Sequence, residues 1–448
     1  MGKWDELAGE KGRRVDTSRL GRAVKLGKLG ARFTGSMIKA QLGRKKPTDE
    51  GEQLEAMADA AMRNAKQIVK VMGEMKGAAM KVGQMLSADP DLVAPEFADM
   101  LSSLQHDAPP MDYVTVAQVV EDALDRPIDA VFKFFDPEPI GSASIGQVHR
   151  ATLPDGRPVA VKVQYPGIEE SLESDLKNLA SLLKMGRVLM TKDRADSFVT
   201  EARNAILSEA DYQAEAQNLQ RFHDLLADFP GVRVPAPVLE LSRRSLLVME
   251  FIEGQKLDDA MAALPAARRD AVAERFIALF VHLYHDNALL HADPHPGNFM
   301  LDGDDNVVLL DFGCVREYEA RWPDSILELL VVYWRRDGEG VRRIFTEQGY
   351  GKPGMVMPDG QVLLEYLDLI LAPLREDAPF DFAEWQVHAK TRQYVRQHLE
   401  MVKLVPPPEM LLYYRVLLGV KGIMSRAGAR LNLRQMAAAA CDRRGVSR

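Results

Sequence analysis

Hydrophobic residues recur every three or four positions between residues 52 and 87, and this spacing predicts one long helix. The stripe is formed by Leu54, Met57, Ala61, Ala65, Ile68, Met72, Met75, Ala79, Val82 and Leu86. From about residue 131 the period changes to that of β-strands. Two apolar runs at 148–153 and 158–164 flank a Pro-Asp-Gly turn, which predicts a β-hairpin.

The pattern after the hairpin alternates between helices and short strands before it becomes helical. We expect helices at 168–190, 197–228 and 263–287, and strands at 232–241, 245–254, 298–301 and 306–311. Residues 320–446 are mostly helical in pattern, and no repeat interrupts them. The predicted fold class is therefore α+β, with a strand-rich part followed by a mainly helical one.

Four parts follow from these patterns. They are a basic arm at 1–50, a helical extension at 51–130, a strand-rich lobe at 131–254 and a helical lobe at 255–448. Residues 1–46 hold 13 Lys/Arg and 4 Asp/Glu, a net charge of +9, so the arm has two explanations, and adhesion to an anionic membrane surface is the functional one. A solvated tail is the alternative explanation.

The remaining composition restricts the class of protein. The net charge of −8 leaves −17 for the rest of the chain, which argues against a nucleic-acid-binding protein. Only two cysteines occur, Cys314 and Cys441, as expected in a reducing compartment. No apolar run reaches 18 residues. We expect a cytoplasmic protein that touches the inner face of a membrane at its periphery.

Two loops carry the strongest chemical signal. The sequence HADPHPGN at 291–298 is followed by LLDFG at 309–313, which reproduces the D-x-x-x-x-N and D-F-G order of phosphoryl-transfer enzymes. We expect Asp293 to lie beside the attacking oxygen, and Asn298 and Asp311 to hold Mg²⁺. A transition-metal cluster of His291, Asp293 and His295 is an alternative. The acidic turn at 302–305 could bind Ca²⁺, but a hairpin turn fits it better.

A glycine-containing loop precedes the predicted hairpin. The sequence from Gly141 to Val148 reads G-x-A-x-x-G-x-V, in which Ala replaces the middle glycine of a phosphate-covering loop. The positions expected to contact a nucleotide are Gly141, Ala143, Ser144, Gly146 and Val148. Glycines there would let backbone N–H groups approach phosphates.

A lysine follows at the position that such a loop requires. Lys162 ends a V-A-V-K run and is expected to reach the nucleotide phosphates. A buried lysine needs an acidic partner, and Glu209, Asp211 and Glu215 are the candidates, of which Glu215 is favoured. Glu250 and Ile252 fall where backbone groups would bind adenine.

Together these motifs resemble the UbiB/AarF family of atypical kinases, relatives of the kinase-like proteins of coenzyme Q synthesis. The decisive segment is the K-x-G-Q signature of Lys81, Gly83 and Gln84. The resemblance extends over residues 55–435 and implies a two-lobed, protein-kinase-like fold with an added N-terminal helical extension. It also implies that the K-x-G-Q helix covers the nucleotide site, with Glu209 and Asp211 as its polar partners.

The resemblance further implies ATP or ADP with Mg²⁺ as cofactors and isoprenoid or quinone lipids as partners. We therefore expect a Mg²⁺-dependent ATPase or phosphotransferase that is linked to ubiquinone or membrane-lipid metabolism. A nucleotide-gated scaffold or lipid-handling chaperone is the first alternative. A kinase of a soluble small molecule, such as an antibiotic, is the second. A homodimer formed through the helical front would be compatible with each.

Overall fold

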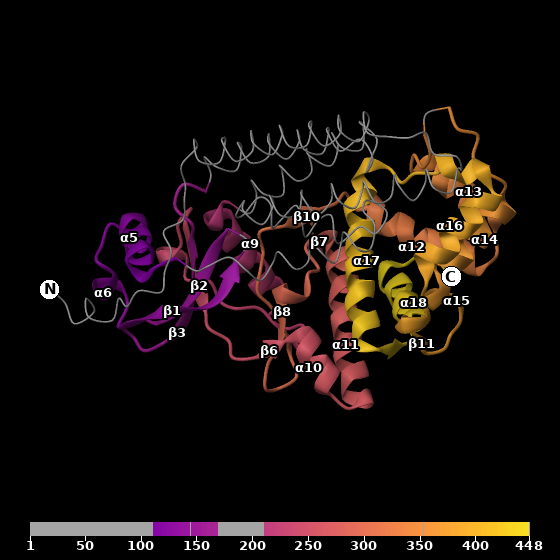
Figure 1. The fold of residues 1–448 in the computed structure, drawn as a ribbon. Coiled ribbons are helices and arrows are strands. Elements are labelled where there is room, and N and C mark those ends of the chain that lie inside the picture. The colour runs from indigo at the N-terminus through magenta and orange to yellow at the C-terminus, as the bar shows by residue number, and fades with distance from the viewer. Residues whose placement is uncertain (1–110, 144, 169–209, 353, 448) are drawn as a thin grey trace, which may run out of the picture. The chain divides into compact units, whose positions relative to one another are not determined.

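A computed structural model describes residues 111–143, 145–168, 210–352 and 354–447 (Figure 1). The predicted arm and the predicted K-x-G-Q helix lie outside the described residues. The same holds for the individual site candidates Lys81, Gly83, Gln84, Ser144 and Glu209. The chain divides into two compact units, the first being Met1–Gln220 with Ala236–Phe251 and the second Arg221–Pro235 with Ile252–Arg448.

The first unit is built on a four-stranded antiparallel sheet of order β1-β2-β3-β5. Its strands are β1 (Phe134–Ala143), β2 (Gly146–Thr152), β3 (Pro158–Gln164) and β5 (Leu246–Glu250). The predicted hairpin is confirmed as β2 and β3, and the uninterrupted buried run from Val159 to Gln164 shows that β3 is covered on both faces. β1 was not predicted, and its prolines are tolerated because it is an edge strand with irregular register.

Helices complete the first unit. Helix α5 (Tyr113–Leu124) contacts β3 and begins where the Asp112 side chain accepts a hydrogen bond from Thr115 N at 2.8 Å. Val116 and Val120, one turn apart, are fully buried. The short α6 (Ile128–Val131) follows. Helix α9 (Tyr212–Leu225) lies within the predicted helix at 197–228, and its residues up to Gln220 belong to this unit.

The second unit is mainly helical, as the sequence predicts. Its longer helices are α10 (Leu257–Ala263), α11 (Ala266–Val281), α12 (Arg321–Trp334), α13 (Gly338–Glu347), α14 (Gly360–Ile370), α16 (Val387–Gln397), α17 (Pro408–Ala427) and α18 (Leu433–Arg444). One apolar cluster joins α12, α13 and α14 around Val341, Ile344 and Leu363. A second joins α12 to α18 around Leu327 and Ala440.

Short strands form the rest of the second unit. One sheet has the order β4-β9-β8-β6, and one hairpin-like pair joins β7 and β10. The bounds are β4 (Val232–Arg233), β6 (Gln255–Lys256), β7 (Leu289–His291), β8 (Phe299–Leu301), β9 (Val307–Leu309) and β10 (Val315–Glu317). The strands predicted at 298–301 and 306–311 are therefore present, each slightly shorter than expected.

Two predicted elements are wrong in detail, and proline explains both. The strand expected at 232–241 is only the two-residue β4, and Leu239–Leu241 forms a 3₁₀ turn, because Pro235 and Pro237 cannot donate to a sheet. The helix expected at 263–287 is present as α11 and the π-helical turn at His282–Asp286, but it begins only after Pro265.

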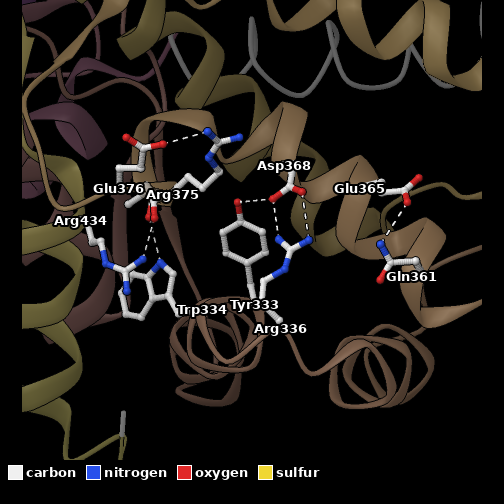
Figure 2. A network of polar contacts seen from close by, with 10 residues as sticks. Tyr333, Trp334, Arg336, Gln361, Glu365, Asp368, Arg375, Glu376 and Arg434 are labelled. Carbon is white, nitrogen blue, oxygen red and sulfur yellow. Dashed lines mark hydrogen bonds and ion pairs between the residues drawn. The ribbon is translucent and has the colours of Figure 1, made fainter.

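Polar side chains hold the helices of the second unit at their surface (Figure 2). Asp368 on α14 accepts hydrogen bonds from the Arg336 guanidinium at 2.6 and 3.1 Å and from the Tyr333 hydroxyl at 2.8 Å. Trp334 donates to the Leu374 carbonyl at 2.9 Å, and the Arg434 guanidinium lies 4.8 Å from the centre of its ring. These contacts tie α12 to α14 and α18. Within the described ranges, no helix is both long enough and apolar enough to span a membrane.

We expect a buried histidine to make the fold sensitive to acid. His285 lies in the π-helical turn after α11 (His282–Asp286), where Nδ1–H donates to the Pro323 carbonyl at 3.2 Å. Burial lowers the pKa of His285 from 6.5 to about 4. Between these two pKa values the unfolded chain binds a proton at His285 that the folded chain does not bind. The free energy of unfolding is therefore highest above pH 6.5 and falls as the pH drops towards 4.

The loss should approach ~3 kcal/mol at pH 4, since each unit of pKa shift corresponds to about 1.4 kcal/mol. Urea unfolding of the wild type and of His285→Asn across this range checks the prediction. The variant keeps an N–H donor for the Pro323 carbonyl but cannot titrate, so it should lose less stability over the same pH interval. Equal pH dependence of the two proteins would contradict the prediction.

Candidate functional site

Strand register places Lys162 within the sheet of the first unit. In the antiparallel ladders Lys162 lies opposite Val148 on β2 and opposite Leu247 on β5. Residues directly opposite in a ladder point to the same face, so these three side chains share one face. The sequence-predicted contacts Lys162 and Val148 are therefore brought together.

Glu215, the favoured candidate, is an acidic partner of Lys162. Lys162 Nζ donates to Glu215 Oε1 at 2.9 Å and to Oε2 at 3.0 Å. The two side chains are 5% and 0% exposed, so neither charge is hydrated. The ammonium also lies 4.9 Å from the centre of the Tyr212 ring, which adds a cation–π contact. Since a buried ammonium is costly when alone, the carboxylate is required for Lys162 to stay charged in the fold.

The start of α9 delivers Glu215 to the lysine. Asp211 Oδ1 accepts hydrogen bonds from Gln213 N and Ala214 N at 3.1 and 3.0 Å. It therefore acts as the helix N-cap and satisfies amides that have no partner inside the helix. Glu215 lies in the first turn, where the helix dipole also favours a negative charge. The structure thus gives Asp211 a capping function, while Glu209 lies outside the described residues.

The predicted phosphate-covering loop is the turn between β1 and β2. Gly141 lies opposite Val148 and Ala143 opposite Gly146, so the chain turns between Ala143 and Gly146. Gly141 has open space where a Cβ would lie. A Cβ on Gly146 would instead come within 2.3 Å of the Val163 carbonyl oxygen. Gly146 is therefore required by the packing of β2 on β3, whatever binds at the loop.

Two polar residues of the same segment were not singled out by the sequence reasoning. Gln147 and His149 alternate with Val148, so they face away from Lys162, and they are 1% and 0% exposed. Gln147 Oε1 accepts a hydrogen bond from Met111 N at 2.7 Å, and its amide group donates to His149 Nε2 at 2.8 Å. His149 Nδ1–H donates to the Asp136 carbonyl at 2.8 Å.

This chain of hydrogen bonds requires a neutral imidazole, since Nε2 must accept. Burial lowers the pKa of His149, which favours that form. The contacts fix the chain at Met111, which lies within the predicted extension at 51–130, onto β2. A sequence signal existed: two polar residues at alternate positions of a strand-like run require buried partners if that face is covered.

The predicted adenine-contacting segment has a defined backbone at Glu250. Its N–H donates to the Ala236 carbonyl at 2.8 Å, and its carboxylate Oε2 accepts from Ala236 N at 3.3 Å. Phe251 N donates to the Pro158 carbonyl at 3.2 Å. Ile252 is buried and begins the part of the segment that belongs to the second unit. The N–H of Glu250 is thus used within the fold.

In the second unit, strand pairing brings together the two chemistry-bearing loops. His291 at the end of β7 lies opposite Val315 at the start of β10, and Ala292 N donates to the Cys314 carbonyl at 2.9 Å. Phe299 of β8 likewise lies opposite Leu309 of β9. The start of segment 292–298 therefore lies beside the end of segment 310–314, and its end lies beside the start of that segment.

Hydrogen bonds then join Asp293, Asn298 and Asp311 into one region. The side-chain Nδ2 of Asn298 donates to the Asp293 carbonyl at 3.0 Å, and Leu310 N donates to the Asn298 carbonyl at 3.0 Å. Asp311 Oδ1 accepts from Gly313 N at 3.1 Å. Hydrogen bonds therefore connect the loop of Asp293 and Asn298 directly to the residue that precedes Asp311.

His291 supports these loops from inside the unit. It is 1% exposed, and its Nε2–H donates to the Asp311 carbonyl at 2.6 Å. Burial lowers its pKa, which favours the neutral ring. The ring also packs against Phe222, Phe299 and Phe312 at centroid distances of 5.5 to 6.2 Å. A packing position of this kind argues against the transition-metal alternative for His291.

No group of three His, Cys, Asp or Glu side chains with the geometry of a metal site occurs in the described part of the chain. The acidic turn at 302–305 has a structural explanation instead. Asp302 Oδ1 accepts hydrogen bonds from Asp304 N and Asn306 N at 3.0 and 2.9 Å. The turn that the sequence favours there is therefore the one in the structure.

The donor set of the second unit suits Mg²⁺ rather than a softer metal. Asp311 supplies a carboxylate, and the Asn298 amide has turned its nitrogen to the Asp293 carbonyl, which directs its oxygen elsewhere. Hard oxygen ligands from one or two side chains, completed by water and phosphate oxygens, are typical of Mg²⁺ bound with a nucleotide. In the first unit, the Lys162 ammonium is of the chemical type that could bind phosphates.

Comparison with known proteins decides the family. Residues 103–345, more than half of the chain, match the ABC1 atypical kinase-like domain. The chain belongs to this family. The predicted resemblance to the UbiB/AarF kinases and the predicted α+β, kinase-like fold class are thereby confirmed. The match includes every candidate residue discussed above except Lys81, Gly83 and Gln84.

Individual ABC1 relatives support the same conclusion. The chain is 32% identical over 418 residues to "Atypical kinase coq-8, mitochondrial" of Caenorhabditis elegans, covering 90% of this chain and 55% of that protein. It is 31% identical to "Atypical kinase COQ8, mitochondrial" of Saccharomyces cerevisiae, covering 82% and 74%. The chain thus spans little more than half of the C. elegans relative.

A solved structure is also similar. The Rv3197 protein of Mycobacterium tuberculosis, determined as a complex with erythromycin, superposes with a TM-score of 0.60 at 27% sequence identity. The similarity covers 86% of this chain and 97% of that one. The similarity in fold to this solved structure therefore extends over most of the chain.

We predict that Glu215→Gln lowers the free energy of unfolding by about 3 kcal/mol, because the buried Lys162 ammonium loses its counter-charge. The double variant Lys162→Met with Glu215→Leu should recover most of that loss, since two apolar residues can replace a buried ion pair. Urea unfolding followed by circular dichroism measures both.

Glu317→Gln is the matched control for this prediction. Glu317 pairs with Arg221, but the two side chains are 69% and 46% exposed. Losing an exposed pair should change stability by less than about 1 kcal/mol. Equal effects of Glu215→Gln and Glu317→Gln would show that burial does not set the strength of the Lys162 pair.

Proposed function

We propose that this ABC1 family member binds Mg-nucleotide and acts as an atypical kinase or ATPase. The observation that carries the proposal is the fully buried, doubly hydrogen-bonded pair of Lys162 and Glu215. A fold keeps an internal ammonium and carboxylate at a cost, and phosphate recognition is a reason for keeping them. The ordered loops that carry Asp293, Asn298 and Asp311 supply the second half of the argument.

Each proposed residue has one task. Lys162 would neutralise nucleotide phosphates, and Glu215 would hold its ammonium in position. Asn298 and Asp311 would supply the oxygen ligands for Mg²⁺. Asp293 would accept the hydrogen bond of the attacking hydroxyl or water. The backbone of the turn from Gly141 to Val148 would cover the phosphates, and the backbone at Glu250 and Ile252 would border the base.

The substrate class is proposed from the relatives. The proteins named COQ8 and coq-8 suggest a function in isoprenoid-quinone or membrane-lipid metabolism. The net charge of +9 on residues 1–46 of the basic arm supports work at an anionic membrane surface, on its cytoplasmic face. The predicted gating helix of Lys81, Gly83 and Gln84 and a homodimer through the helical front complete the proposal.

A second candidate acceptor rests on the solved structure of Rv3197. That protein was determined with erythromycin, so a soluble, macrolide-like small molecule is a second class worth testing. A panel containing a quinone precursor, an isoprenoid lipid and a macrolide, each added to Mg-ATP, would separate the classes. Stimulated turnover or a phosphorylated product with one of them would identify the acceptor class.

The decisive experiment is phosphate release from Mg-ATP, with and without anionic liposomes. Asp311→Asn should lower turnover by about a hundredfold or more, because it removes a charged Mg²⁺ ligand worth several kcal/mol in the transition state. Asp304→Asn removes the same charge from an exposed position of the turn at 302–305 and should leave turnover unchanged. Wild-type turnover that survives in Asp311→Asn would exclude the assignment, and no turnover in any condition would favour a nucleotide-gated scaffold.

A separate prediction concerns the membrane. Deleting residues 1–46 should abolish co-sedimentation with anionic liposomes, and binding of the intact protein should weaken steeply with salt. Liposomes of neutral lipid are the control, and they should bind neither protein. Undiminished liposome binding after the deletion would show that a surface other than residues 1–46 contacts the membrane.

A further inference from the structure

Helix α17 lies directly behind the loop that carries Asp293. This helix belongs to the same unit as the loop and packs against α10 and α11 (Figure 1). At the point of closest approach, Gly419 faces Pro294, the residue after Asp293. A Cβ built on Gly419 would lie 2.5 Å from Pro294 Cγ, 3.3 Å from its Cβ and 3.4 Å from its carbonyl oxygen.

No side chain fits between the two elements as they stand. Carbon atoms in contact are about 3.5 Å apart, so a methyl group at Gly419 would have to move Pro294 or the helix by about 1 Å. The atom it meets belongs to a ring that is fused to the backbone. Pro294 can move this atom only by changing its ring pucker, and its Cβ and carbonyl oxygen would still lie at 3.3 and 3.4 Å from the added methyl group.

The helix is the more firmly held of the two. Tyr413 on α17 stacks on Tyr284 at a centroid distance of 4.3 Å, and the Tyr284 hydroxyl donates to Met410 Sδ at 3.6 Å. Tyr414 shares a hydrogen bond of 2.5 Å with the Tyr350 hydroxyl. These contacts anchor the first half of α17 on two other parts of the unit.

The loop is tied together by hydrogen bonds of its own. His295 N donates to the Asp293 carbonyl at 2.8 Å, and Asn298 Nδ2 donates to the same oxygen at 3.0 Å. A displacement of Pro294 is consequently passed to the Asp293 backbone on one side and to Asn298 on the other. On the N-terminal side, Arg415 Nη2 of α17 reaches the Ala292 carbonyl at 3.5 Å.

We infer that Gly419 is a positioning residue for the Asp293 loop: the absence of a side chain at Gly419 sets how close the loop lies to α17 and thereby where Asp293 and Asn298 are held. The part of this inference that concerns turnover rests on the proposed function. The part that concerns loop geometry does not depend on it. Gly419 does not touch the reacting groups and acts only through Pro294.

Gly422 provides a matched control on the same helix. A Cβ at Gly422 would meet only the far end of the Arg426 side chain, at 3.4 Å. Alanine at either position should favour the helix by up to about 1 kcal/mol. Any difference between Gly419→Ala and Gly422→Ala is therefore a consequence of the contact with Pro294.

Steady-state kinetics with Mg-ATP is the first test. Gly419→Ala should lower kcat by about tenfold to a hundredfold, because a misplacement of about 1 Å at reacting groups has effects of that size. Its KM for nucleotide and its melting temperature should stay close to those of the wild type, and Gly422→Ala should keep the wild-type kcat. Adding Pro294→Ala to Gly419→Ala removes the clashing Cγ and should restore part of the lost kcat.

Hydrogen exchange is the second test, and it needs no activity. Amides of residues 291–298 should exchange faster in Gly419→Ala than in Gly422→Ala, while those of α17 should not. Wild-type kcat and wild-type exchange in Gly419→Ala would overturn the inference. If the wild type has no turnover, the proposed function fails, and the exchange comparison alone still decides whether Gly419 positions the loop.

Discussion

The buried charge of Lys162 is the constraint on which the first unit depends. Its ammonium needs a carboxylate within hydrogen-bonding distance, and the structure meets that need with Glu215 at 2.9 and 3.0 Å. Glu215 is delivered by the first turn of α9, which in turn begins where Asp211 caps it. The register of β3, the residue at which α9 begins and the charge of Glu215 therefore have to agree. A change in any one of them would remove the contact between the buried ammonium and this carboxylate.

The second unit obeys a different constraint, which is the placement of two loops without regular structure of their own. The N–H and C=O groups of irregular backbone lack the repeating hydrogen bonds of a helix or sheet, so each buried group needs a partner of its own. Here the pairing of β7 with β10 brings the loop ends together, and His291, Asn298 and Leu310 supply the bonds that close the space between them. Helix α17 adds a steric limit from behind. The loops are thus held by hydrogen bonds on one side and by contact on the other.

Much of this arrangement could be predicted from local sequence. The strands around Lys162 follow from valine-rich runs beside a Pro-Asp-Gly turn, and the order of Asp293, Asn298 and Asp311 follows from spacing alone. The misses have physical causes. β1 contains two prolines and lacks alternation, so only its edge position and its pairing with β2 make it a strand. Pro235, Pro237 and Pro265 override runs whose apolar pattern favours a longer element.

Gly419 marks the limit of what a sequence pattern can reveal. Residue spacing within α17 gives no hint that Pro294, 125 positions earlier, lies against the helix, because that contact exists only after the chain has folded.

The segment from Gly146 to His149 shows how strand geometry refines a motif-based interpretation. The G-x-A-x-x-G-x-V motif as a whole predicts a phosphate-covering loop. Its second half forms a strand, however, and successive residues of a strand point to opposite faces. Val148 lies opposite Lys162, whereas Gln147 and His149 face the other way and hold Met111. Position 146 has to be glycine because a Cβ there would clash with the Val163 carbonyl oxygen of β3. One short segment thus serves two faces of the sheet: one carries the lysine, and the other receives the chain where the predicted extension joins the sheet.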